Sequence, residues 1–224
     1  MFKNRRFAFT LAEVLVTLGI IGVVSAMTIP SLTQSWQKQA YVAQLKKVYS
    51  QLAQAAALAI QEEQADTLDE SKYIGSEGAK NFLRTYFKVV NDCGNNSTPC
   101  FANSYRSISG SNEVIARPEL AITTADGTAI AVAYGWHWGD NSYDHDGLSL
   151  QVDINGAKGP NVVGRDLFYI EVYSDGKVVE SYDDSWRQIN RNTEQAKQSC
   201  IEGWGYAGLG CLTNIMNNGW VMDY

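Results

Sequence analysis

The chain has 224 residues, of which 45% are hydrophobic and 19% charged, so it is not a disordered chain and can bury a core. Its 18 Lys and Arg against 24 Asp and Glu leave a formal net charge of −6, which disfavours nucleic acid as a partner. Four cysteines without a Cys-x-x-Cys spacing leave little room for a zinc site, and two histidines limit the catalytic arrangements that could be built.

The first thirty residues separate charge in the order typical of a membrane protein with a cytoplasmic N-terminus. Residues 1–8 carry three basic side chains and no acid, and Glu13 is the one charge in residues 9–29. The rest of the chain has 15 basic and 23 acidic residues, a net charge of −8. As a helix, residues 9–29 would extend about 31 Å, the thickness of a bilayer core.

Two simpler interpretations compete for this segment. One is a secretory signal peptide cut after Ala26, and the other is a plain signal anchor. Glu13 lies where the apolar part of a signal peptide should be uncharged, and the helical pattern continues past Ala26. A signal peptide is therefore disfavoured.

Residues 8–30 resemble the N-terminal signature of type IV pilins and type II secretion pseudopilins. The likeness lies in the basic leader, the Phe-Thr-Leu start, the acid, the apolar run and the proline. In that family a prepilin peptidase removes the leader, and the new N-terminal residue is methylated. The resemblance implies cleavage between Ala8 and Phe9 and N-methylation of Phe9. Ala8 stands where the family usually has Gly, and both residues are small.

Glu13 and Pro30 are the expected assembly residues, together with Phe9. An ionised carboxylate inside a bilayer costs about 2–4 kcal/mol and normally has a partner. The free amino group of Phe9, in the same chain or in a neighbour, is the nearest candidate, and the resemblance favours the neighbour. A simpler role for Glu13 is to stabilise the positive end of the helix dipole. Pro30 is expected to bend a continuing helix rather than to end it.

A second helical stretch continues the first. Apolar residues recur at spacings of three and four over residues 39–64, which predicts an amphipathic helix packed on a globular head. We therefore expect a leader at residues 1–8, a transmembrane and assembly helix at 9–30, an amphipathic continuation at 31–64 and a head at 65–224.

The head is expected to combine helices with an antiparallel sheet. A helix is predicted over residues 78–91, and a helix or loop over 185–199. Strand patterns and Asp-Gly turns predict four or five strands, within residues 120–124, 128–134, 148–154, 167–173 and 177–180. The pilin-like fold implies the same α+β class, a long N-terminal membrane-spanning helix packed on an antiparallel sheet.

Four cysteines lie in the part of the chain that this topology places outside the cytoplasm, where disulfides form: Cys93, Cys100, Cys200 and Cys211. Three pairings are open, and the sequence-local one, Cys93–Cys100 with Cys200–Cys211, is favoured. Many pilins close a C-terminal loop with a disulfide, and the resemblance assigns this role to Cys200 and Cys211.

Two loops are rich in the oxygen donors that calcium prefers. The donors are Asp140, Asp144 and Asp146 in the first loop and Asp153, Asn155 and Asp166 in the second. Neither loop has EF-hand spacing, and Asp-Gly and Asn-Gly pairs are common turn formers. Ordinary turns are favoured, calcium stays an alternative, and no other cofactor is expected.

The resemblance implies a structural subunit rather than an enzyme. A prepilin peptidase would process it, a single helix would hold it in the bacterial inner membrane with its head outside the cytoplasm, and other pilin or pseudopilin subunits would assemble with it into a type II secretion or type IV pilus-like filament.

The alternative is a low-abundance minor pilin or tip protein that binds a surface or a secreted substrate through tryptophans, namely Trp136, Trp138, Trp186, Trp204 and Trp220. An anchored enzyme is disfavoured because the sequence has no nucleophile paired with a base and no phosphate-binding loop.

Overall fold

The computed structural model describes residues 10–73, 75–113, 115, 117–133, 147–180, 193–202 and 208–224. The chain forms two compact units, Met1–Ala40 and Tyr41–Tyr224. Helix α1 (Leu11–Glu63) is 53 residues long and contributes to both units. Each unit is described separately below.

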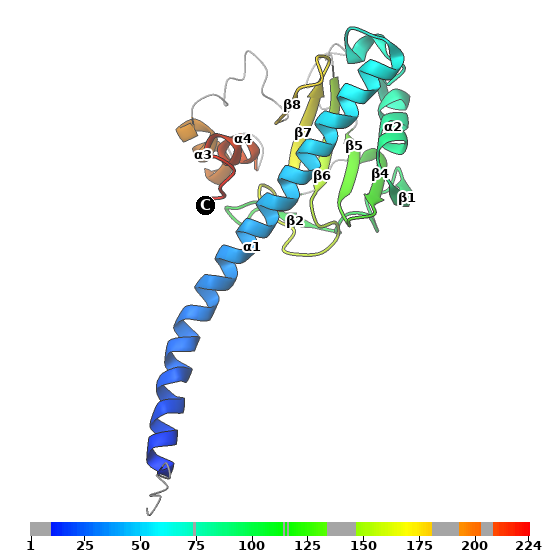
Figure 1. Ribbon diagram of the computed structural model, residues 1–224. Helices are drawn as coiled ribbons and strands as arrows, with labels where there is room; N and C mark the ends of the chain where they lie inside the picture. Colours follow the sequence, from blue (N-terminus) through cyan, green and yellow to red (C-terminus); the bar gives the residue numbers. More distant parts are fainter. Residues whose placement is uncertain are drawn as a thin grey trace, which may run out of the picture. The chain divides into compact units, whose positions relative to one another are not determined.

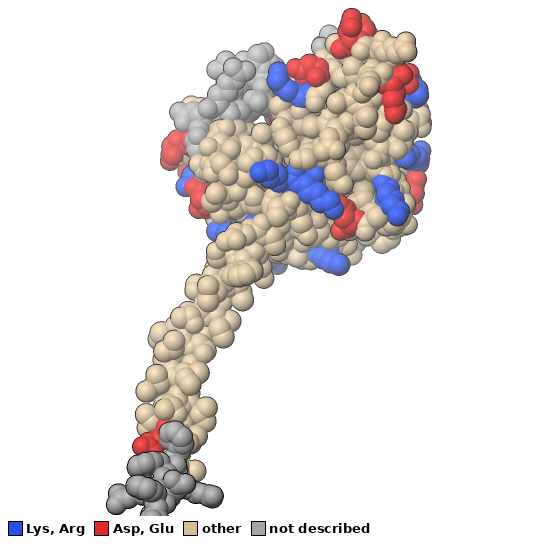
Figure 2. Space-filling view, in the orientation of Figure 1, with Lys and Arg blue, Asp and Glu red and all other residues tan. Residues whose placement is uncertain are grey.

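The first unit consists of the N-terminal part of α1, whose side chains are almost all exposed. Its apolar surface is large, with Leu11, Met27 and Trp36 each more than 70% exposed. Figure 2 shows this stretch as a nearly uncharged surface. A soluble helix would bury such a face, so the exposure indicates a segment made for an apolar environment.

In the second unit, residues 41–63 of α1 cross one face of a sheet (Figure 1). The buried side chains recur at spacings of three and four: Val42, Leu45, Val48, Leu52, Ala55, Ala56 and Ala59. This is the amphipathic stripe that the sequence predicts, and it forms one wall of the main core.

The sheet has six strands in the order β1-β4-β5-β6-β7-β8, and each neighbouring pair is antiparallel. Their bounds are β1 (Val89–Gly94), β4 (Pro118–Thr124), β5 (Ala129–Ala133), β6 (Gly147–Asp153), β7 (Leu167–Tyr173) and β8 (Val178–Glu180). A separate hairpin pairs β2 (Tyr105–Arg106) with β3 (Asn112–Glu113). The expected α+β class is confirmed, and the sheet has six strands where the sequence predicts four or five.

The predicted helix over residues 78–91 is wrong at both ends. Helix α2 covers Gly75–Tyr86, and Val89 already belongs to β1. Val89 packs against the main core whereas Val90 is 62% exposed, so the chain there alternates with the period of a strand. Two adjacent β-branched residues favour that outcome over a further helical turn.

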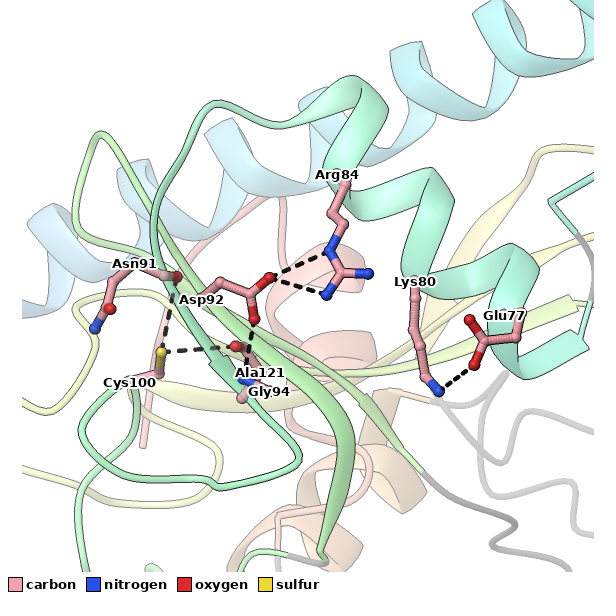
Figure 3. A network of polar contacts seen from close by, with 8 residues as sticks. All are labelled: Glu77, Lys80, Arg84, Asn91, Asp92, Gly94, Cys100 and Ala121. Carbon is pink, nitrogen blue, oxygen red and sulfur yellow. Dashed lines mark hydrogen bonds and ion pairs between the residues drawn. The ribbon is translucent and has the colours of Figure 1, made fainter.

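A polar network joins α2 to β1 (Figure 3). The Arg84 guanidinium donates from two nitrogens to one oxygen of Asp92, and the other oxygen accepts the Gly94 N–H. The Gly94 N–H and the Arg84 side chain lower the pKa of Asp92. The network holds the edge strand against the helix.

The sheet has a core on each face. On β6, Leu148, Leu150 and Val152 belong to the main core with α1. The opposite face of the sheet packs Ala121, Ala129 and Ala131 against a second cluster that contains Phe101 and Tyr105. Both faces are therefore covered, which agrees with the continuous burial of residues 150–154.

The C-terminal part adds two helices, α3 (Thr193–Glu202) and α4 (Cys211–Asn217), which pack together beside β8. The buried carboxylate of Glu180 accepts the backbone N–H groups of Leu212 and Thr213, each at 3.1 Å. Trp220 packs edge-on against Tyr49 of α1 at 5.3 Å between ring centroids. These contacts attach the end of the chain to the sheet edge and to α1.

Candidate functional site: the N-terminal helix

Helix α1 begins with a reciprocal cap between Thr10 and Glu13. The Thr10 N–H and hydroxyl donate to Glu13 Oε2 at 2.9 and 2.8 Å, and the Glu13 N–H donates to the Thr10 hydroxyl at 3.2 Å. This is the capping-box geometry, in which Ser or Thr is followed three residues later by Glu. The Glu13 carboxylate therefore caps the N-terminus of its own helix by accepting the Thr10 N–H.

The hydroxyl groups of the apolar stretch bond within the helix. Thr17 donates to the Val14 carbonyl, and Thr28 donates to the Val24 carbonyl, both at 2.9 Å. Because each hydroxyl proton has an acceptor one turn back, these residues need no water. The polar residues of this segment are thus compatible with an apolar surrounding.

Helix α1 continues through Pro30, which lies inside it. Proline removes one backbone donor from the helical ladder. Close by, the Thr33 hydroxyl lies 3.0 Å from the Ile29 carbonyl and 2.9 Å from the Pro30 carbonyl. The structure therefore agrees with a continuing helix at Pro30 and not with a helix end.

The helix is long and apolar enough to cross a membrane. A window of 18 residues within it has a mean hydropathy of 2.0, and none of that window is buried within the protein. The predicted processing residues Ala8 and Phe9 lie outside the described residues.

A comparison with known protein families identifies the sequence motif that this helix carries. A family model described as the prokaryotic N-terminal methylation motif matches residues 3–29. This chain carries the type IV pilin signature. No curated protein and no solved structure matches the chain.

The pilin signature contains both members of the cap, Thr10 and Glu13, and ends one residue before Pro30. It points to a structural subunit, implies processing by a prepilin peptidase and assembly with other pilin subunits, and fits a membrane-anchored chain. The match covers residues 3–29 and none of the head. The roles of residues in the head are therefore inferred from the structure alone.

Two disulfides stabilise the head of this pilin-like chain. Cys93 is bonded to Cys100 and Cys200 to Cys211, which is the sequence-local pairing. The first bond joins the edge strand β1 to the second core cluster, and the second joins α3 to α4 in the main core. The first bond therefore ties an edge strand to a buried cluster, and the second links two helices at positions that are both buried.

Two of the predicted oxygen donors are buried acceptors in turns. Asp153 accepts the Asn155 N–H and the Tyr105 hydroxyl, and Asp166 accepts the N–H groups of Asn161 and Val162. Burial raises the pKa of Asp153 to about 7 although the Tyr105 hydroxyl lowers it, and burial also raises the pKa of Asp166. Both carboxylates hold loop backbone in place, which is the favoured turn interpretation.

The described residues contain no group of three or more His, Cys, Asp or Glu placed to hold a metal ion. The other predicted donor loop, with Asp140, Asp144 and Asp146, lies outside the described residues. Of the tryptophans considered for binding, Trp220 is half-buried against Tyr49, and Lys46 lies 5.5 Å above its ring. The remaining ones, Trp136, Trp138, Trp186 and Trp204, also lie outside the described residues.

Thr10 is the functional residue that the sequence analysis missed. The resemblance includes Thr10 only as part of the Phe-Thr-Leu start, whereas in the structure Thr10 holds the Glu13 carboxylate. The signal was present in the spacing, since Thr followed three residues later by Glu before an apolar run is the pattern of a capping box.

Proposed function

We propose that this chain is a pilin-like subunit that a prepilin peptidase cleaves between Ala8 and Phe9. Phe9 is then N-methylated, and the helix enters a type II secretion or type IV pilus-like filament. The observation that carries the proposal is the match to the methylation motif over residues 3–29. The exposed apolar surface of the same helix supports it, because a filament or bilayer core would cover that surface.

In this proposal residues 1–8 are the leader, and residues 9–30 serve first as the membrane anchor and then as the filament core. Cleavage creates an ammonium group on Phe9, and the Glu13 carboxylate of a neighbouring subunit pairs with it. An ion pair in an apolar filament core is strong because the surrounding dielectric is low. The pair would define the stagger between neighbouring helices, and the head would lie outside the cytoplasm.

The test is the intact mass and the N-terminal sequence of the chain made in cells that contain a prepilin peptidase. A chain that begins at Phe9 and is one methyl group heavier supports the proposal. A chain that still begins at Met1, or one that begins after Ala26, would contradict it. The variant Phe9→Ala serves as a control, because it leaves the leader charges unchanged and alters only the residue to be methylated.

A further inference from the structure

The apolar surface of α1 continues past Pro30. Ile29, Leu32 and Trp36 leave 56%, 56% and 73% of their surface exposed. Because they are spaced by three and four residues, they share one helix face. The first buried side chain of α1 is Val42, in the second unit. This face therefore needs a cover that the described residues do not supply.

The polar side chains of α1 change in character just after Thr33. The hydroxyls of Ser31 and Thr33 each donate to a backbone carbonyl of the preceding turn, at 2.9 to 3.0 Å, so they need no water. The next polar residues are mostly amides, with one lysine: Gln34, Ser35, Gln37, Lys38 and Gln39. Amide and ammonium groups require hydrogen-bond partners, which water and lipid headgroups provide. The helix thus passes from an apolar to a polar surrounding between Thr33 and Lys38.

The length of the uncharged stretch matches a bilayer. No charged residue separates Glu13 from Lys38, and Thr33 lies 20 residues beyond Glu13. That is about 30 Å along the helix, the thickness of the hydrocarbon core. Trp36 lies about 5 Å farther along, within the headgroup layers that bring a bilayer to about 40–45 Å in total. A span that ended at Pro30 would place Trp36 about 9 Å beyond the hydrocarbon core, outside that layer.

Trp36 has the chemistry of a residue at a membrane–water interface. Its ring is apolar and its N–H needs an acceptor, which is why Trp is enriched at both interfaces of a bilayer. No described residue accepts the Trp36 N–H. The phosphate and ester oxygens of lipid headgroups can accept it, whereas the apolar side chains of a neighbouring helix could cover the ring but not pair the N–H. The exposed face therefore fits lipid better than a second helix.

We propose that Trp36 anchors α1 in the outer interface of a phospholipid bilayer, with Leu32 and Ile29 of the same face among the adjoining acyl chains. The inference rests on the proposed function, in which α1 is first a membrane anchor, and it extends the embedded stretch past Pro30 to Thr33. The anchor defines the depth of the helix in the bilayer. Because the ring has to leave the lipid before the helix enters a filament, the anchor retains the unassembled subunit in the membrane.

The first test measures how deep the Trp36 ring lies. The full chain is reconstituted in phosphatidylcholine vesicles whose acyl chains carry bromine, a quencher of indole fluorescence, either near the headgroups or near the chain ends. The wild type should be quenched more strongly by the bromine near the headgroups. Trp36→Phe should lose most of this quenching, because the ring at the interface no longer contributes.

Trp220→Phe is the matched control for this test. Trp220 packs against Tyr49 in the second unit, so its replacement should leave the quenching at the wild-type level. Equal losses of quenching in Trp36→Phe and Trp220→Phe would overturn the proposal. Stronger quenching of the wild type by bromine at the chain ends would also overturn it, because the ring would then lie in the hydrocarbon core.

The second test moves the anchor along the same helix face. Combining Trp36→Leu with Leu32→Trp shifts the indole by four residues, about 6 Å toward the N-terminus, so the helix should slide outward by that distance. A Ser31→Cys thiol reports the shift through a membrane-impermeant maleimide added to spheroplasts, which expose the outer face of the inner membrane. All four native cysteines are in disulfides, so the new thiol alone reacts.

Ser31→Cys should be protected while Trp36 is present and labelled once the indole is at position 32. Ser35→Cys is the control and should be labelled in both backgrounds. The same labelling of Ser31→Cys in the two backgrounds would reject an anchor at Trp36. Both tests work on a chain that still begins at Met1, so an unprocessed wild type would count against the proposed function alone.

Discussion

Thr10 binds only one of the two carboxylate oxygens of Glu13. Its N–H and its hydroxyl both donate to Oε2, and among the described residues Oε1 accepts no hydrogen bond. The cap therefore orients the carboxylate and leaves one oxygen for a further donor. An ammonium group from a neighbouring subunit could bind Oε1 without breaking the cap, so capping and the proposed intersubunit pair are compatible.

The cap should be measurable at the start of α1. Thr10→Val removes the hydroxyl that both donates to Glu13 and accepts from it, a loss of about 1 kcal/mol for an N-cap. Amide hydrogen exchange at residues 11–14 of the chain in detergent micelles should then become about fivefold faster. Thr10→Ser is the control and should exchange like the wild type. Unchanged exchange in Thr10→Val would show that the cap does not stabilise this helix end.

Glu13→Gln should separate processing from assembly. The side chain keeps its shape and its acceptor oxygen but loses its charge, and breaking a desolvated charge pair costs about 2–5 kcal/mol. We expect a chain that still begins at Phe9, measured by intact mass, and a filament fraction reduced by at least about thirtyfold. Wild-type amounts of filament from Glu13→Gln would contradict the intersubunit pair.

The disulfide between Cys200 and Cys211 should stabilise the C-terminal helices. It closes a short loop, for which the chain-entropy relation gives about 2–3 kcal/mol. Replacing both cysteines by Ser should lower the free energy of unfolding of the full chain in detergent by about that amount. Hydrogen exchange should rise first in α4. If exchange became faster in β5 and β6 but did not change in α4, the disulfide would not stabilise the C-terminal helices.

Stability should depend on pH through Glu180. Burial raises its pKa to about 7, although the Thr213 side chain and the backbone N–H groups of the α4 terminus lower it. Between pH 4.5 and 7 the folded chain retains a proton that the unfolded chain has released. The free energy of unfolding should therefore fall as pH rises through this window, by on the order of 3 kcal/mol, and level off above pH 7.

Glu180→Gln should flatten that part of the profile, which denaturant unfolding at several pH values would measure. Asp153, whose pKa is also raised to about 7, should keep a residual slope of the same sign. Glu202→Gln is the control, because Glu202 is exposed on α3. A slope in Glu180→Gln as steep as that of the wild type would show that Glu180 does not titrate in this range.

Several features followed from the sequence because their signals are local. The apolar stretch, the single acid at Glu13 and the proline stand in fixed order along one helix, and this order carries the resemblance to the pilin signature. The stripe from Val42 to Ala59 likewise predicted which face of α1 is buried. Asp-Gly turns between alternating runs indicated the antiparallel hairpins β4–β5 and β7–β8.

Other features required the folded chain, because they depend on residues far apart in sequence. Val89 and Val90 could extend a helix or start a strand, and pairing with β4 decides for the strand. Burial of Glu180 depends on α4 returning to β8, because the Leu212 N–H that its carboxylate accepts lies 32 residues later in the sequence. The sequence alone determined the long N-terminal helix, its apolar stretch and the positions of Glu13 and Pro30 within it, since these signals are periodic and local. Tertiary contacts decided the edge strand and the buried carboxylates, since burial and strand pairing are properties of the packed sheet.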